Sequence, residues 1–127
     1  MEIKDLRLRR YYNLLKALLK RQREINPTDI ELLENAIIVL NILEKIAAIF
    51  HKDDHKEAEE ILLALWSYDN DGVKLFILLN LLDAANKEKN LSPNAVIKLE
   101  QIKNNPVYSS LYFEAWCKLK GLKAHWN

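Results

Sequence analysis

Two histidines in the middle of the chain are the first candidates for metal chemistry. His51 and His55 stand four residues apart and enclose Asp53 and Asp54. On one continuous helix both imidazoles would share a face, and imidazole nitrogens and carboxylate oxygens are common zinc ligands. The two aspartates, however, stand where one helix is expected to end and the next to begin, which separates the imidazoles. The segment also lacks an evident third ligand and the glutamate of a zincin helix. We therefore expect a polar turn between helices and no metal site.

The sequence Asp69-Asn70-Asp71-Gly72 has the composition of a calcium-binding loop without its spacing. Counted from Asp69, the glycine falls too early for such a loop, and the position that should hold a glutamate is occupied by Asn80. A helix start explains the segment without calcium.

Catalytic groups are equally hard to assemble from this sequence. Cys117 is the only cysteine, and nothing in the sequence brings a histidine to it as an activating base. Gly72 and Gly121 are the only glycines, so a phosphate-cradling glycine loop is impossible. The carboxylates between Asp53 and Glu60 are typical of a solvated helix start. We therefore predict a protein that is not an enzyme and that uses no cofactor or small-molecule substrate.

A row of basic residues, the basic ridge, lies along one face of the helix expected near the N-terminus. At about 100° per residue, four of these side chains fall within about 60° of one another, on a line on the order of 20 Å long, and a fifth widens it. No acidic residue stands between Leu6 and Arg23. The ridge could contact the phosphates of a nucleic acid or an acidic protein face, although lysine and arginine are also ordinary on a solvated helix face. Its residues are Arg9, Arg10, Lys16, Lys20 and Arg23.

The last helix carries one aromatic residue, Phe113, well away from its expected buried face and another, Trp116, at the edge of that face. Phe113, Trp116 and Lys120 stand at i, i+3 and i+7, which places two large rings and a cation side by side. We call these three residues the aromatic stripe. Exposed aromatic side chains are typical of protein contacts, because they bring a large apolar area at low entropy cost. The alternative is that this helix is buried on two sides.

Prolines and capping residues divide the chain into the elements that carry these side chains. Each proline follows a good capping residue, as in Asn26-Pro27, Ser92-Pro93 and Asn105-Pro106, and proline suits the first helical position because its missing N–H would be unpaired there. Two more helix starts are expected at Asp54 and Asp71. The predicted helices cover residues 3–24, 28–51, 55–68, 72–88, 93–104 and 106–120, and Gly121 precedes a short tail at 122–127.

These elements predict an all-α fold, a compact single-domain globule of about six helices over residues 1–127. The second and fourth helices are apolar almost all round, so we expect both to be nearly fully buried. The connections are only a few residues long, which leaves no visible domain boundary. A short α-solenoid-like stack of helical hairpins is the alternative, although no internal repeat supports it.

The amino-acid composition excludes several other classes of protein. Half of the 127 residues are apolar and 29% are charged, which excludes a disordered chain, and a single cysteine excludes an internal disulfide. The longest apolar run, Ile61 to Trp66, is too short to cross a membrane, and no apolar segment follows the first charges as in a signal peptide. We therefore expect a cytoplasmic protein without a membrane partner.

The net charge of +1 conceals a segregation along the chain. Residues 1–25 hold eight basic and three acidic residues, residues 26–100 hold seven and fourteen, and residues 101–127 hold four and one. Basic ends around an acidic middle fit a binding surface or mutual neutralisation. The leading hypothesis is a small non-enzymatic helical protein that acts through protein–protein contacts, by self-association or as a subunit of a larger assembly. The alternative is a nucleic-acid-binding accessory protein that uses the basic ridge.

Overall fold

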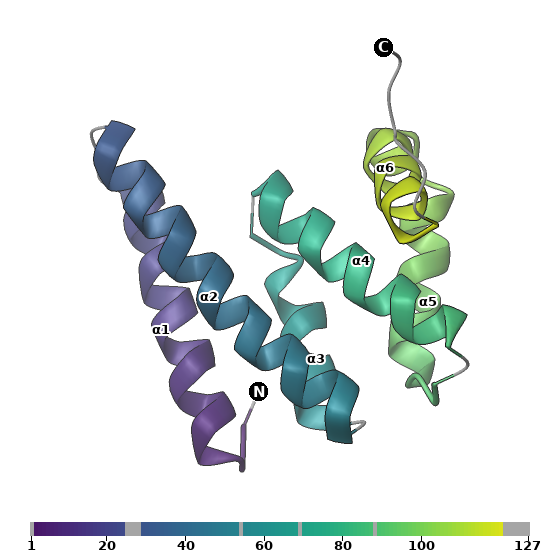
Figure 1. The fold of residues 1–127 in the computed structure, drawn as a ribbon, viewed down its shortest axis with the longest axis horizontal. Coiled ribbons are helices and arrows are strands. Elements are labelled where there is room, and N and C mark those ends of the chain that lie inside the picture. Colours follow the sequence, from purple (N-terminus) through teal and green to yellow (C-terminus); the bar gives the residue numbers. More distant parts are fainter. Residues whose placement is uncertain (1, 25–28, 54, 69, 88, 121–127) are drawn as a thin grey trace. The chain divides into compact units, whose positions relative to one another are not determined.

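The computed structural model describes residues 2–24, 29–53, 55–68, 70–87 and 89–120, without the side chains of 21–24, 29–33 and 53. These residues form six α-helices and one 3₁₀ turn with no strand among them, which confirms the predicted all-α class (Figure 1). No helix in these ranges has both the length and the apolar character required to cross a bilayer. The elements are α1 (Leu6–Glu24), α2 (Asp29–Asp53), α3 (Lys56–Leu65), α4 (Asp71–Asn86), α5 (Pro93–Lys103), η1 (Pro106–Tyr108) and α6 (Ser109–Leu119).

Contacts within the chain group it into two compact units. The N-terminal unit is Met1–Leu62 and the C-terminal unit is Leu63–Asn127. The boundary falls inside the last turn of α3. The expectation that residues 1–127 form one domain stays a prediction.

In the N-terminal unit, α1 and α2 pack side by side in opposite directions (Figure 1). Leu8, Leu15 and Leu19 are buried at i, i+7 and i+11, so they share one face of α1. Ile46 and Phe50, four residues apart, are fully buried on α2. Each such side chain contributes about 1.5–3 kcal/mol by leaving water, so this apolar seam stabilises the helical pair.

The prediction that the second helix is nearly fully buried is wrong for the first half of α2. Ile37, Ile38 and Leu40 are 53%, 44% and 45% exposed. Within the N-terminal unit, α1 is the helix that packs along α2, and one neighbour covers only part of a helix surface. An apolar sequence on all sides therefore did not lead to burial on all sides.

In the C-terminal unit, α4, α5 and α6 pack against one another. Every residue of α4 from Val73 to Ala84 is buried or half-buried, in agreement with the burial predicted for the fourth helix, and only its two ends are exposed. Asn80, near the middle of this stretch, donates from its side chain to the Phe76 carbonyl of its own helix at 2.8 Å. The polar amide is thereby accommodated on a helix with little wet surface.

Side-chain caps define where the helices of this unit begin. Ser92 accepts from the Ala95 backbone N–H at 3.3 Å and precedes Pro93, and Asn105 accepts from the Val107 backbone N–H at 2.9 Å. Ser92 thus caps α5 as predicted, and Asn105 caps the 3₁₀ turn η1 (Pro106–Tyr108). At α4 the capping side chain is Asn70, one residue before the predicted Asp71; its Oδ1 accepts from the Val73 backbone N–H at 3.0 Å.

The sixth predicted helix differs at its start, because Pro106–Tyr108 forms the 3₁₀ turn η1 before α6 begins at Ser109. A 3₁₀ turn is a frequent lead into an α-helix. The starts predicted at Asn26-Pro27 and Asp54, and the expected end at Gly121 with its tail at 122–127, lie outside the described residues.

Candidate functional site

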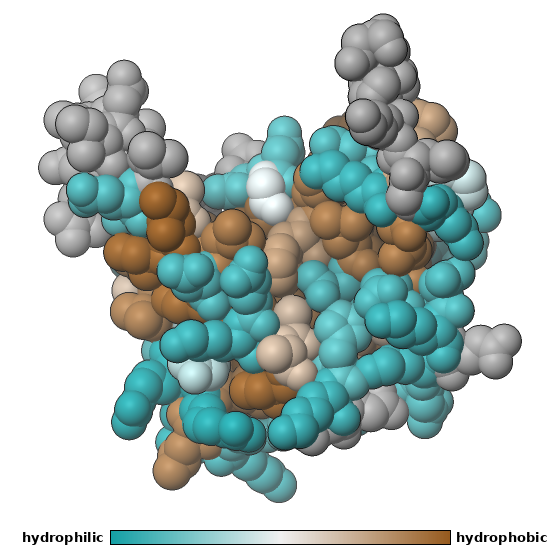
Figure 2. All heavy atoms as spheres, in the orientation of Figure 1, coloured by the Kyte–Doolittle hydropathy of each residue, from teal (hydrophilic) through white to brown (hydrophobic). Residues whose placement is uncertain are grey.

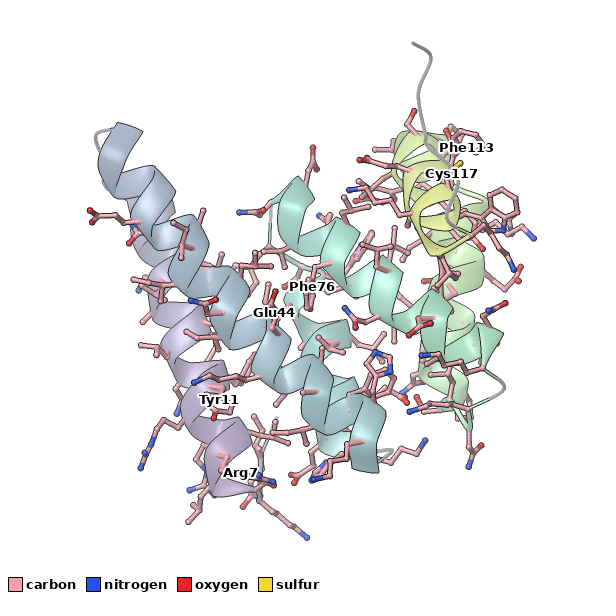
Figure 3. The ribbon with its side chains drawn as sticks, viewed as in Figure 1. Arg7, Tyr11, Glu44, Phe76, Phe113 and Cys117 are labelled. Atoms are coloured by element: carbon pink, nitrogen blue, oxygen red, sulfur yellow. The ribbon has the colours of Figure 1, made fainter. Side chains whose placement is uncertain are left out.

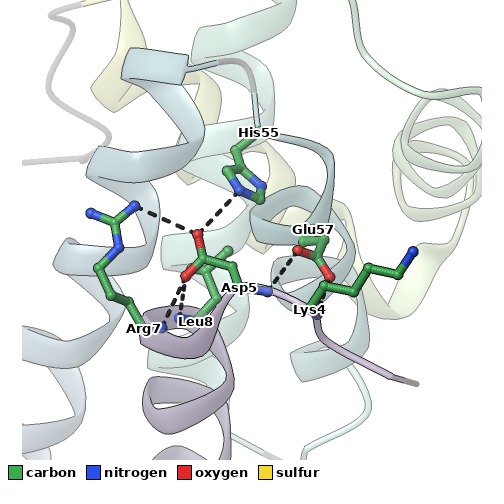
Figure 4. A network of polar contacts seen from close by, with 6 residues as sticks. All are labelled: Lys4, Asp5, Arg7, Leu8, His55 and Glu57. Carbon is green, nitrogen blue, oxygen red and sulfur yellow. Dashed lines mark hydrogen bonds and ion pairs between the residues drawn. The ribbon is translucent and has the colours of Figure 1, made fainter.

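Two carboxylates, those of Asp5 and Glu57, hold the residues that precede α1 (Figure 4). We call residues 2–5 the N-terminal segment. Asp5 caps α1, because its Oδ1 accepts from the backbone N–H groups of Arg7 at 2.9 Å and Leu8 at 3.2 Å. Glu57 accepts from the backbone N–H groups of Lys4 at 2.6 Å and Asp5 at 3.1 Å. Residues more than 50 positions apart in sequence are thus joined through main-chain donors.

Two basic side chains flank the Asp5 carboxylate. Its Oδ2 lies 3.4 Å from His55 Nε2 and 3.5 Å from Arg7 Nη2. The hydrogen bond from the Leu8 backbone N–H, followed by those from Arg7, holds the pKa of Asp5 below its ordinary value. Figure 4 shows Asp5 between His55 and Arg7. These contacts have a structural role, because they hold the start of α1 in place.

The two histidines lie on either side of the turn between α2 and α3, as the sequence predicted. His51 belongs to the last turn of α2, and its ring packs against that of Phe50 with the centroids 4.9 Å apart. His55 precedes α3 and contacts Asp5. Within the described ranges, no three histidine, cysteine, aspartate or glutamate side chains are grouped so that they could hold a metal ion.

The basic ridge lies largely on the solvent side of α1. Arg9, Arg10 and Lys20 are exposed. Lys16 is half-buried, with its ammonium 4.6 Å from the centre of the Tyr12 ring. Arg9 also has a structural role, because its Nε donates to the Ile3 carbonyl at 2.9 Å. The side chain of Arg23 lies outside the described part of the chain.

The aromatic stripe lies on the open side of α6. Phe113 is 48% exposed and Trp116 is 40% exposed. Lys120 is exposed at the end of the helix, where its Nζ donates to the Asn86 side chain at 3.2 Å.

The alternative reading of α6, burial on two sides, also holds for part of this helix. Ala115 and Cys117 are both buried, although they point about 160° apart on a helical wheel. This agrees with the packing of α6 against both α4 and α5. Phe113 and Cys117, both labelled in Figure 3, stand one helical turn apart on α6. The stripe therefore lies on α6 between its two packed sides, with both rings less than half exposed to solvent.

One cluster in the C-terminal unit was not predicted. Trp66 and Tyr108 pack edge to face, with ring centroids 5.2 Å apart and planes at 72°. Lys74 Nζ lies 5.3 Å from the Trp66 centroid and 5.5 Å from that of Tyr108. Lys98 Nζ lies 5.7 Å from the same Trp66 centroid. We call these four residues the lysine–aromatic cluster. The available signal was Lys74 itself, the only charge in the apolar run from Val73 to Leu82.

Neither the family models, the curated proteins nor the solved structures provide a match to this chain. Its function therefore has to be argued from its own surfaces.

Apolar side chains reach the surface in both units, and Figure 2 shows such residues among hydrophilic ones. In the N-terminal unit they come from α1 and α2, and in the C-terminal unit from α5, η1 and α6. Patches of this kind are typical of surfaces that bind other molecules. The exposed large apolar residues are Leu6, Leu14, Ile37, Ile38, Leu40, Val96, Ile97, Val107, Phe113 and Trp116.

Proposed function

We propose that this chain acts through protein–protein contacts, with the aromatic stripe of α6 as the contact surface. The observation that carries the proposal is the exposure of two large rings, Phe113 and Trp116, one helical turn apart. Tryptophan and other large aromatic side chains dominate the binding energy of interfaces when a partner covers them. A helix that is packed on two sides also presents them on a rigid support, which lowers the entropy cost of association.

Lys120 adds a positive charge to this surface, which favours a partner with a negative charge at the matching position. It stands at the end of the stripe and is tethered to Asn86 at the end of α4. A partner that offers an apolar groove with a carboxylate at its rim would match the stripe. Self-association and incorporation into a larger assembly are both contacts of this kind.

The test compares two double variants, each of which replaces two exposed apolar side chains with alanine. Phe113→Ala/Trp116→Ala removes both rings, and Val96→Ala/Ile97→Ala removes two exposed apolar side chains from α5 of the same unit. Light scattering on a sizing column measures self-association over a range of concentrations, and circular dichroism confirms that each variant is folded. Pull-down with quantitative mass spectrometry measures other partners. The stripe variant should lose the association that the α5 variant retains.

Two findings together would contradict the proposal: the wild-type chain is strictly monomeric, and the stripe variant retains every partner that the wild type captures. Equal losses in both double variants would also contradict it, because the contact would then not depend on the stripe.

A second candidate function, nucleic-acid binding, is supported by the exposure of Arg9, Arg10 and Lys20 on a helix segment without acids. Arg9 holds the N-terminal segment, so Arg10→Ala/Lys20→Ala is the cleaner test. Gel shifts at several salt concentrations should show binding that weakens steeply with salt, with a slope smaller by about two in this variant. Lys52→Ala/Lys103→Ala removes the same charge elsewhere and should bind like the wild type. No binding at low salt would exclude this function.

A further inference from the structure

The lysine–aromatic cluster combines positive charge with burial. Lys74 is only 8% exposed. Its ammonium lies between two rings that meet edge to face, at nearly equal distances from both. The four side chains come from four places: the turn after α3, α4, α5 and η1.

Neither lysine of the cluster has a carboxylate partner in the part of the chain that the structure describes; their contacts are with the rings. Two exposed lysines of the same unit are different. Lys87 pairs with Asp83 at 3.1 Å and Lys118 with Glu114 at 3.7 Å, both one helical turn away. Lys74, which is only 8% exposed, thus has no carboxylate partner among the described residues to replace the water it has lost.

Ring contacts alone leave this charge poorly compensated. A cation–π contact stabilises an ammonium far less than the loss of its water destabilises it. A ring face also accepts no more than one or two of the three N–H donors of an ammonium. Lys98 brings a second positive charge to within 5.7 Å of the centre of the same indole. An anion at this position would balance the charge of Lys74 and accept its remaining N–H donors.

We propose that Lys74 and Lys98 bind a small tetrahedral oxyanion, of the phosphate class, beside Trp66. Two ammonium groups match the charge of a phosphate, and its several oxygens can accept hydrogen bonds from lysines on different helices at once. Lys98 is half-buried on a flexible four-carbon stem, so it can close on an anion held by Lys74. The rings of Trp66 and Tyr108 limit water on one side, which strengthens the ionic contact.

Trp66 provides a direct signal for the test. In a Trp116→Phe/Trp126→Phe background it is the only tryptophan of the chain. Inorganic phosphate is titrated at constant ionic strength and pH, with sodium chloride as the compensating salt, while Trp66 emission is recorded. The proposal expects a saturable change with one site per chain, competition by sulfate, and a melting temperature that rises with phosphate concentration.

Three lysine variants locate the site. Lys74→Met and Lys98→Met keep the apolar stem and remove the charge, and each should weaken phosphate binding at least tenfold. Lys103→Met removes an exposed charge from the same helix as Lys98 and should bind phosphate like the background protein. Circular dichroism checks that all three are folded. Because Met at position 74 buries no charge, this variant is expected to fold at least as well as the parent.

Four results would overturn the proposal: no saturable change at any phosphate concentration reached, the same change with chloride, no competition by sulfate, or binding that survives in both Lys74→Met and Lys98→Met. Loss of binding in the Lys103→Met control would overturn it as well, since the effect would then come from net charge. None of these measurements depends on the aromatic stripe as a contact surface, so the two proposals succeed or fail separately.

Discussion

At the start of α1, Asp5 combines the roles of helix cap and ion-pair partner. Its carboxylate accepts from two backbone N–H groups and lies beside His55 and Arg7. We predict that Asp5→Ala lowers the free energy of unfolding by about 1 kcal/mol, the usual cost of losing a cap acceptor. Urea unfolding followed by circular dichroism measures the change. Asp5→Asn keeps a good cap and should lie closer to the wild type; an alanine variant as stable as the wild type would contradict the assignment.

The lowered pKa of Asp5 gives this contribution a definite pH dependence. A carboxyl group whose pKa is lower in the folded than in the unfolded chain stabilises the fold above its unfolded pKa, near the ordinary value of 3.8. That stability is lost as the pH falls through the lower folded pKa. The difference in unfolding free energy between wild type and Asp5→Ala should therefore be constant above about pH 5 and shrink below the ordinary value. Urea series at decreasing pH test this, and a difference that grew on acidification would show the opposite sign.

Residue types in the sequence identified some of these sites and not others. Ser92 and Asn105 stand next to prolines, and a local signal of that kind is sufficient to place a cap. Asp5 had no such signal, because its second support, Glu57, is 52 residues away. Lys74 was hidden for the same reason: its ring neighbours Trp66 and Tyr108 come from separate elements. Interactions that depend on distant contacts cannot be read from spacing along one helix.

At the scale of elements, Glu57 connects the N-terminal segment to α3. We predict that Glu57→Ala frees this segment, because the backbone N–H groups of Lys4 and Asp5 lose their acceptor. Hydrogen exchange at these two amides should accelerate at least tenfold, and Ile3, now buried, should become accessible to proteolysis nearby. The expected cost in unfolding free energy is about 1–2 kcal/mol.

Glu60→Ala is the matched control for this prediction, since Glu60 is an exposed carboxylate on the same helix. It removes an equal charge and should leave exchange at Lys4 and Asp5 unchanged. If both variants accelerate exchange alike, net charge controls the segment and the hydrogen bonds of Glu57 do not.

The helices themselves were predictable because their signals are local. Apolar periodicity and caps indicated six helices, and their limits agree with the structure within a few residues. Burial of a whole helix was not predictable in the same way. The sequences of α2 and α4 are both apolar on nearly all sides, yet α4 is buried or half-buried from Val73 to Ala84 and the first half of α2 exposes isoleucines. Periodicity indicates which residues can be buried, while the number of neighbouring helices decides which are.

This difference along α2 leads to a paired prediction. Ile46 is fully buried and Ile37 is 53% exposed on the same helix. Ile46→Ala should lower the free energy of unfolding by about 2–5 kcal/mol through lost burial and a cavity. Ile37→Ala should change it by no more than about 1 kcal/mol, since a half-exposed side chain loses little on truncation. Urea unfolding of both variants measures the two changes in unfolding free energy. Comparable costs would mean that Ile37 is covered in solution.

At the scale of the whole molecule, the two compact units raise the question of cooperativity. Trp66, Trp116 and Trp126 all belong to Leu63–Asn127, so tryptophan emission reports the C-terminal unit, while far-ultraviolet circular dichroism reports the helices of both units. A unit of roughly 60 residues buries only about 60% of the surface that its unfolded chain exposes, which makes it marginally stable alone. We therefore expect the two units to unfold together as one domain.

This expectation predicts coincident transitions. Emission and circular dichroism should give the same urea midpoint, as for a two-state domain. Ile46→Ala, which lies in Met1–Leu62, should lower both midpoints equally, although no tryptophan belongs to that unit. A helical signal that persists after the emission change is complete would show that the N-terminal unit is stable by itself. A shift of the dichroism midpoint alone would lead to the same conclusion, because destabilisation of one unit would then not reach the other.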